Sequence, residues 1–164
     1  MPFITRRAVL AALALVVPVP PSLAGAEADP VLLTVVDAAT GRQAAFTRSE
    51  IDALPQAVIA TRTDFTEGRS EFRGPLAADL LDRAGIGAAR EVRLVAANDY
   101  AVTVPVADFR AYGVILATEL DGRRLSLRDR GPIWVMYPAD DFPELRQPQY
   151  VDRLIWQLVR IEAR

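Results

Sequence analysis

The chain has 164 residues, of which 51% are hydrophobic and 24% charged, enough for one globular domain but not for two large ones. Its 19 basic and 21 acidic residues give a formal charge of −2, so no positive surface for a nucleic-acid backbone is expected. The sequence contains no cysteine and no histidine, and all of its basic residues are arginine. These features exclude thiolate and imidazole catalysis, Cys/His zinc sites, disulfides and lysine Schiff bases.

The first 26 residues have the layout of a secretory signal peptide, with Arg6 and Arg7 followed by an apolar run over residues 8–17. Small residues then permit cleavage after Ala24 or after Ala26. The apolar run is too short for a membrane span of about 20 residues. We therefore expect a periplasmic domain over residues 27–164 with no stable membrane insertion, and an uncleaved anchor is the alternative. The arginine pair also resembles a twin-arginine export signal.

The first half of the mature chain reads as short strands and two helices. In chain order we expect strands at 31–36 and 42–46, a short helix, a strand at 58–65, a loop at 66–70 and a helix over 74–85. Thr47 with Glu50 three residues later is a capping-box pattern, so it predicts the start of the short helix. Gly74-Pro75 predicts the start of the longer helix, because proline suits the first helical position.

The second half contains more strand signals. We expect strands at 91–97 and 100–104, a helical turn ending at Gly113, a hairpin of 114–120 with 123–127, a strand at 133–137, a surface loop at 139–149 and a strand at 154–161. Asp121-Gly122 is the strongest hairpin signal, because these residues readily adopt the positive backbone torsions of a two-residue turn. Together the elements predict an α+β fold in a single sheet-dominated domain.

Polar and aromatic residues interrupt the predicted strands in four segments, at 65–68, 98–100, 129–137 and 150–156. Binding residues concentrate on loops that a packed scaffold holds in place. The four segments therefore predict a pocket built from several strand ends.

Over residues 58–164 the chain resembles the oxidoreductase molybdopterin-binding domain family, the fold of sulfite oxidase. The matching motifs are Phe72-Arg73-Gly74-Pro75-Leu76, Asn98-Asp99-Tyr100, Asp121-Gly122, Gly131-Pro132-Ile133-Trp134 and Ile155-Trp156-Gln157-Leu158. The chain is especially similar to small exported members that lack the molybdenum-ligating cysteine. This resemblance implies the sulfite oxidase fold and a pterin-sized cavity.

One departure from the family concerns the metal. In catalytic members a cysteine thiolate anchors molybdenum within a Cys-Val-Glu-Gly segment, and the similar segment here reads Phe65-Thr66-Glu67-Gly68. The ring of Phe65 cannot replace a thiolate, and the chain has no cysteine elsewhere. We therefore expect a pterin cofactor without molybdenum.

A pterin is a flat bicycle with a guanidine-like edge, so it needs aromatic faces to stack on and acceptors for its N–H groups. Trp134 or Tyr137 is expected to stack, Glu67 or Asp99 to accept, and Arg130 to contact an anion or carbonyl. Since alternate residues of a strand face opposite sides, one of Trp134 and Tyr137 is expected to be structural. Trp156, near the end of the chain, is expected to lie in the core. The candidate binding residues are Phe65, Glu67, Asn98, Asp99, Tyr100, Arg130, Trp134 and Tyr137.

The resemblance implies a non-catalytic pterin sensor that acts on an inner-membrane signalling protein. Two alternatives remain open: a molybdopterin-dependent oxidoreductase, and a structural adaptor that binds no small molecule.

Overall fold

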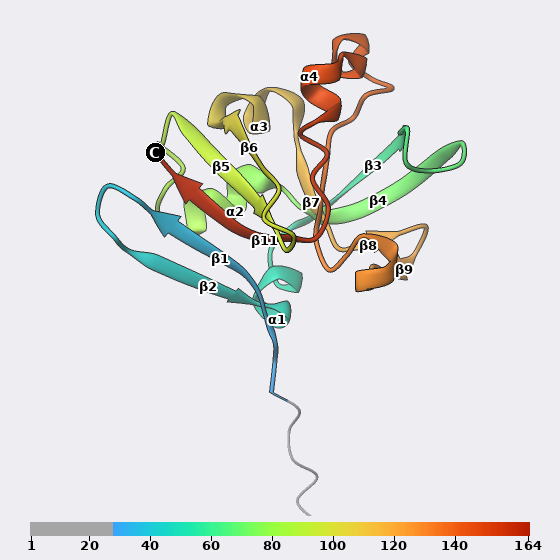
Figure 1. Cartoon of the computed structure of the whole chain (residues 1–164). Helices are drawn as coiled ribbons and strands as arrows, with labels where there is room; N and C mark the ends of the chain where they lie inside the picture. Colours follow the sequence, from blue (N-terminus) through green and yellow to red (C-terminus); the bar gives the residue numbers. More distant parts are fainter. Residues whose placement is uncertain (1–27) are drawn as a thin grey trace, which may run out of the picture.

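Three β-sheets form the frame of the protein in the computed structural model, which describes residues 28–164 (Figure 1). The predicted signal peptide, residues 1–26, lies outside the described residues. The strands are β1 (Val31–Asp37), β2 (Gln43–Thr47), β3 (Gln56–Arg62), β4 (Arg69–Pro75), β5 (Glu91–Ala96), β6 (Ala101–Pro105), β7 (Ile115–Ala117), β8 (Glu119–Leu120), β9 (Arg123–Arg124), β10 (Trp134–Met136) and β11 (Leu158–Ala163). The helices are α1 (Arg48–Asp52), α2 (Ala77–Arg83), α3 (Val106–Tyr112) and α4 (Pro148–Val151), with 3-10 turns at Leu127–Asp129 and Pro143–Arg146. The predicted α+β, sheet-dominated fold is confirmed.

The last strand lies in the middle of the largest sheet. In the order β2-β1-β11-β5-β6, strand β11 pairs in parallel with β1 and antiparallel with β5. Its residues Leu158 and Ile161 are fully buried, so the end of the chain contributes directly to the core. The chain segment that leads into β11 is thereby fixed across the middle of the molecule (Figure 1).

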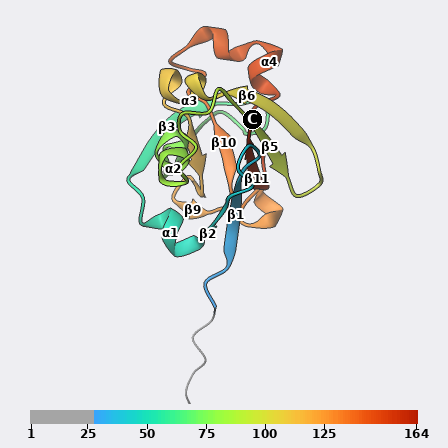
Figure 2. The same cartoon turned by 90° about the vertical axis from the view of Figure 1, so that its left-hand side faces the viewer.

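The two smaller sheets complete the frame. One has the order β3-β4-β8-β9, and the other pairs β10 with β7. A bridge between Leu76 and Ile115 places β7 beside the end of β4, and a bridge between Trp134 and Trp156 places β10 beside the segment before β11. Helices α2 and α3 lie next to each other on one side of the molecule (Figure 2).

Several local predictions are confirmed. Thr47 accepts a hydrogen bond from the Glu50 backbone at the start of α1, and the Glu50 side chain accepts one from the Thr47 backbone, which completes the capping box. Asp121 and Gly122 both have positive φ in the turn between β8 and β9, as a tight hairpin requires. Gly113 ends α3 in the left-handed region.

The loop predicted at 66–70 is present only up to residue 68, and the predicted helix begins later than Gly74. Strand β4 covers residues 69–75 and pairs with the whole of β3, and α2 begins only at Ala77. Buried Ser70 and Phe72 alternate with exposed Glu71 and Arg73, which is the two-residue period of side chains along a strand. Strand pairing therefore prevails over the helix-start preference of Gly-Pro.

Three further strand predictions also differ from the structure. Strand β3 ends at Arg62, so Phe65 lies in the loop between β3 and β4. The predicted hairpin of 114–120 with 123–127 is shorter, because β7 leaves it to pair with β10 while β8 pairs with β4 and β9. The predicted strand at 154–161 begins at Leu158, after an irregular segment.

None of the helices in residues 28–164 is long and apolar enough to cross a membrane.

We predict that Gly74→Ala destabilises the domain by about 2 kcal/mol or more, because overpacking of this kind forces backbone shifts. A Cβ atom at Gly74 would lie 2.0 Å from the carbonyl oxygen of Leu116 in β7. Thermal unfolding followed by circular dichroism checks this, with exposed Glu71→Ala on the same strand as the control. Equal melting temperatures for the two variants would contradict the prediction.

Candidate functional site

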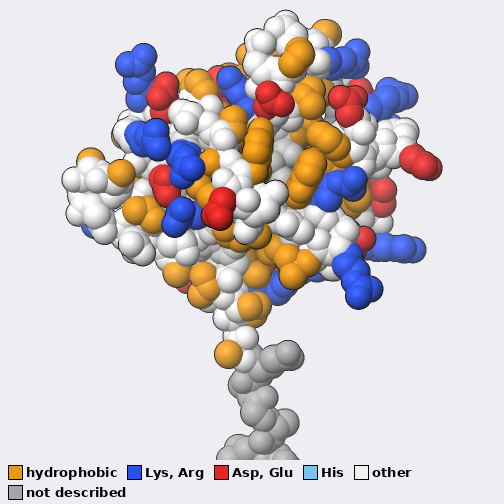
Figure 3. All heavy atoms as spheres, viewed as in Figure 1, with side chains coloured by type: hydrophobic (Ala, Val, Ile, Leu, Met, Phe, Trp, Pro, Cys, Tyr) orange, Lys and Arg blue, Asp and Glu red, His pale blue; other side chains and the backbone are white. Residues whose placement is uncertain are grey.

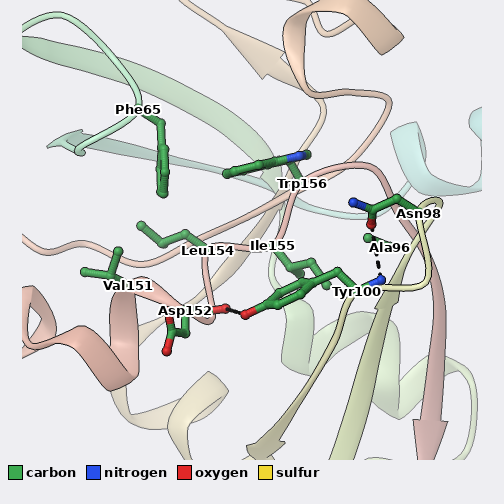
Figure 4. Close-up of a pocket in the computed structure, with 9 residues that line it drawn as sticks. All are labelled: Phe65, Ala96, Asn98, Tyr100, Val151, Asp152, Leu154, Ile155 and Trp156. Carbon is green, nitrogen blue, oxygen red and sulfur yellow. Dashed lines mark hydrogen bonds between the residues drawn. The ribbon is translucent and has the colours of Figure 1, made fainter.

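A cavity of about 250 Å³ opens where three parts of the chain meet (Figure 4). They are the loop after β3, the turn between β5 and β6, and the segment between α4 and β11. The lining residues are Phe65, Ala96, Asn98, Tyr100, Val151, Asp152, Leu154, Ile155 and Trp156. In the space-filling view, hydrophobic side chains gather in the middle of this face, with charged side chains around them (Figure 3). The cavity is slightly smaller than most ligand pockets, which span roughly 300–1,000 Å³.

One wall of the cavity is aromatic. The rings of Phe65 and Trp156 meet edge to face, with centroids 4.9 Å apart and an interplanar angle of 76°. Figure 4 shows Trp156 and Tyr100 on opposite sides, with Leu154 and Ile155 between them. Aromatic walls of this kind offer large apolar contact area to a flat ring.

The opposite wall is fixed by hydrogen bonds of Tyr100. Its hydroxyl donates to the backbone carbonyl of Asp152 over 3.2 Å, and its backbone N–H donates to the Asn98 side chain over 3.2 Å. Partial burial and the nearby Asp152 carboxylate raise the pKa of Tyr100. The hydroxyl therefore stays protonated at neutral pH and remains a donor across the cavity mouth.

The segment that supplies Trp156 is held by backbone hydrogen bonds to the segment before and within β10. The Gln157 N–H donates to the carbonyl of Arg130, the Leu158 N–H to that of Ile133, and the Val135 N–H to that of Ile155. The end of α4 is held separately, because Arg153 forms an ion pair with Asp108 of α3. These contacts fix both ends of the segment between α4 and β11, which lines the cavity.

The loop that carries Phe65 is closed by its own threonines. The Phe65 N–H donates to the Thr63 hydroxyl over 3.1 Å, and the hydroxyls of Thr63 and Thr66 lie 3.0 Å apart. Threonine side chains commonly satisfy backbone groups in turns in this way. The loop therefore presents the Phe65 ring to Trp156 and to the cavity.

Trp134 was predicted to stack on a ligand, but the structure places it beneath the cavity wall. Its side chain is fully buried, and its Nε1–H donates to the Leu154 carbonyl over 3.0 Å. Its ring packs edge to face on Phe72, with centroids 5.4 Å apart, and on Trp156, with centroids 6.3 Å apart. Trp134 thus supports Trp156, and Trp156, predicted to be a core residue, forms the exposed wall.

Tyr137 is also a core residue and lies away from the cavity. It is 1% exposed and packs against Tyr112 and Tyr150, each with centroids 6.3 Å away. Its hydroxyl has no hydrogen-bond partner among the described residues, and burial raises its pKa. A hydrogen bond with the Tyr150 hydroxyl raises the pKa of neighbouring Tyr112 to about 12. The sequence predicted that one of Trp134 and Tyr137 is structural, whereas both side chains are buried in the core.

The predicted acceptors Glu67 and Asp99 are exposed and do not line the cavity. Asp99 has a φ of 66° at the tip of the turn between β5 and β6, where its role is local geometry. The acidic residue in the lining is Asp152, which sequence reasoning missed. The only sequence signal for it was the polar, aromatic segment 150–156 as a whole. Among the predicted residues, the structure brings Phe65, Asn98 and Tyr100 together in the lining.

Arg130 lies next to the aromatic wall. Its guanidinium carbon is 5.3 Å from the ring centroid of Trp134 and 5.7 Å from that of Trp156. A cation at this distance over an indole is attracted by the ring's electron density. Arg130 therefore places a positive charge beside the cavity rather than inside it.

The comparisons with known proteins agree with this fold. Residues 46–140 match the family described as the oxidoreductase molybdopterin binding domain. The chain belongs to this family. The sulfane dehydrogenase SoxCD from Paracoccus pantotrophus has a similar structure, with a TM-score of 0.60 and 15% sequence identity. The likeness covers 80% of this chain and 37% of that chain, so it concerns the fold alone. A search of curated proteins gives no match.

Membership of the molybdopterin-binding family implies a pterin cofactor, and the lining residues fit one. Phe65, Trp156 and Tyr100 supply apolar faces, while Asn98 and Asp152 supply polar groups at the edge. The lining offers no thiolate to a metal, because the chain has no cysteine. Residues 28–164 also hold no cluster of three or more carboxylates that could bind a metal ion.

We predict that Trp134→Ala destabilises the domain by about 3–5 kcal/mol, as expected for truncation of a buried aromatic side chain. Trp156→Ala removes a partly exposed ring and is expected to lower the melting temperature much less. Thermal unfolding of both variants checks this. Trp134 would not be the support of the aromatic wall if Trp156→Ala proved the more destabilising change.

Proposed function

We propose that this protein binds a pterin reversibly in the cavity between Phe65, Tyr100 and Trp156 and performs no molybdenum chemistry. The observation that carries the proposal is the cavity itself: its lining has aromatic faces together with Asn98 and Asp152. Its residue Phe65 stands where the family resemblance places the metal-anchoring cysteine. A flat heterocycle with an N–H-rich edge is the ligand class that this combination fits.

The polar groups would recognise the edge of the pterin. The Asp152 carboxylate is an acceptor that suits the guanidine-like N–H groups, since charge-assisted hydrogen bonds are about twice as strong as neutral ones. The Asn98 amide both donates and accepts, so it can pair with a ring nitrogen or with the oxo group. Arg130, held over Trp156 at the cavity edge, supplies a positive charge for a carbonyl oxygen or an anionic substituent.

The wider role in the proposal is that of a sensor. An exported domain that binds a pterin without reacting with it would report occupancy to an inner-membrane signalling partner from the periplasm. This part is supported by the resemblance to small exported family members and by the signal-peptide pattern in residues 1–26.

The direct test is to purify the protein from its own exported compartment, denature it, and analyse the released small molecule by mass spectrometry and the metal content by elemental analysis. A pterin without stoichiometric molybdenum is the expected result. Stoichiometric molybdenum with a pyranopterin would overturn the proposal in favour of an oxidoreductase. If nothing is released, titration with oxidised and tetrahydro-biopterin decides, and failure of both to bind would also overturn it.

We predict that Asp152→Asn weakens biopterin binding by about 10- to 100-fold, since hydrogen bonds to a charged group contribute roughly 1.5–3 kcal/mol. Asp99→Asn is a matched control, because Asp99 lies outside the cavity and asparagine tolerates its positive φ. Isothermal titration calorimetry on both variants checks the prediction. Equal affinities would show that the Asp152 carboxylate does not contact the ligand.

A further inference from the structure

Gln157, the residue between Trp156 and β11, has a backbone conformation that is unusual for glutamine. Its φ of 51° lies in the left-handed region, which is costly for a residue with a Cβ atom. Within residues 28–164, four non-glycine residues have positive φ: Asp99, Asp121, Arg130 and Gln157. The two aspartates lie in tight turns, where aspartate tolerates this conformation. Glutamine and arginine have no such preference, so the strain at these two residues needs another reason.

Three hydrogen bonds hold Gln157 in this conformation. Its backbone N–H donates to the carbonyl of Arg130 over 3.0 Å, and its side-chain Nε2 donates to the carbonyl of Leu127 over 2.9 Å. Its own carbonyl accepts from the N–H of Ala97 over 2.9 Å. A strained backbone persists only where the surrounding structure over-determines it, and such residues cluster at active sites and ligand clamps. The conformation of Gln157 is therefore maintained by two other segments of the chain.

The two segments that hold Gln157 contribute opposite sides of the site. Arg130 belongs to the first and places its guanidinium carbon 5.7 Å from the ring centroid of Trp156. Ala97 belongs to the turn between β5 and β6, which carries Tyr100 on the side opposite Trp156 (Figure 4). Gln157 itself does not line the cavity. It is the point at which the aromatic wall, the neighbouring positive charge and the opposite wall are fixed relative to one another.

We propose that Gln157 is a positioning residue for the ligand of the cavity: its left-handed backbone orients the Trp156 ring, and its side-chain amide holds the Arg130 segment beside that ring. This inference rests on the proposed function, because the ligand concerned is the flat ring bound in the cavity. A binding site works only when its contact groups are held within about 0.5 Å of the productive geometry by supporting residues. Changes at Gln157 therefore lower affinity through Trp156, without removing any contact of Gln157 with the ligand.

The test uses two substitutions at this position. Gln157→Gly removes both the strain and the Nε2 donor, whereas Gln157→Met keeps the strain and the side-chain length and removes only the donor. Both are expected to weaken biopterin binding by about 3- to 10-fold in calorimetry, since the geometry of aromatic contacts is worth up to about a tenfold change in affinity. Only Gln157→Met is expected to lower the melting temperature, because relief of strain in Gln157→Gly offsets the lost hydrogen bond. A purely structural role predicts instead that affinity falls only where stability falls.

Asp99→Gly is the matched control, because Asp99 also has a positive φ and does not line the cavity. It is expected to keep the affinity of the wild-type protein. A second measurement needs no ligand. The chain has two tryptophans, Trp134 and Trp156, whose rings meet edge to face with centroids 6.3 Å apart. A fixed aromatic arrangement gives a near-ultraviolet circular dichroism signal, which both Gln157 variants are expected to weaken and Asp99→Gly to preserve.

The outcomes separate this inference from the proposed function. If biopterin binds and Gln157→Gly keeps the wild-type affinity, or if Asp99→Gly loses as much affinity, the inference is overturned while the proposed function stands. If the wild-type protein binds neither oxidised nor tetrahydro-biopterin, the proposed function fails. The near-ultraviolet signal then decides whether Gln157 positions Trp156, and an unchanged signal in both Gln157 variants overturns that assignment as well.

Discussion

The site depends on one local constraint, the pairing of the segment before β11 with the segment around β10. Three backbone hydrogen bonds join these segments, and the Trp134 indole adds a fourth to the Leu154 carbonyl. Because β11 is held between β1 and β5 in the largest sheet, the pairing connects that sheet to the two smaller ones. The orientation of Trp156, and with it the aromatic wall, follows from this connection. A protein interior transmits such constraints because it is close-packed.

The lining of the cavity suits the binding of a flat ring. Its ring contacts are directional but weak one by one, and Asn98 and Asp152 add polar groups to the lining.

The sequence predicted the parts of the fold that depend on local chemistry. The capping box of Thr47 and Glu50 and the Asp121-Gly122 turn are determined within a few residues, and both are present. Strand β4 was missed, because its stability comes from pairing with β3 and from the close approach of Gly74 to β7. Of the site, Phe65, Asn98 and Tyr100 could be found from the sequence, whereas the exchange of roles between Trp134 and Trp156 could not. That exchange depends on which indole faces the three-sheet core, and burial is set by packing across distant segments.

The loop that carries Phe65 also bears on how long a ligand would stay bound. A thiolate bound to a metal adds a coordinate bond to the other contacts that hold the group in its site. A phenyl ring edge-on to an indole, 4.9 Å between centroids, offers contact without a bond. Whatever lies against it leaves at a rate set by non-covalent affinity, and the filled fraction follows the surrounding concentration. Under the proposed function, Phe65 in place of a metal-anchoring cysteine therefore leaves binding reversible, so that the occupancy of the site reports the ligand concentration.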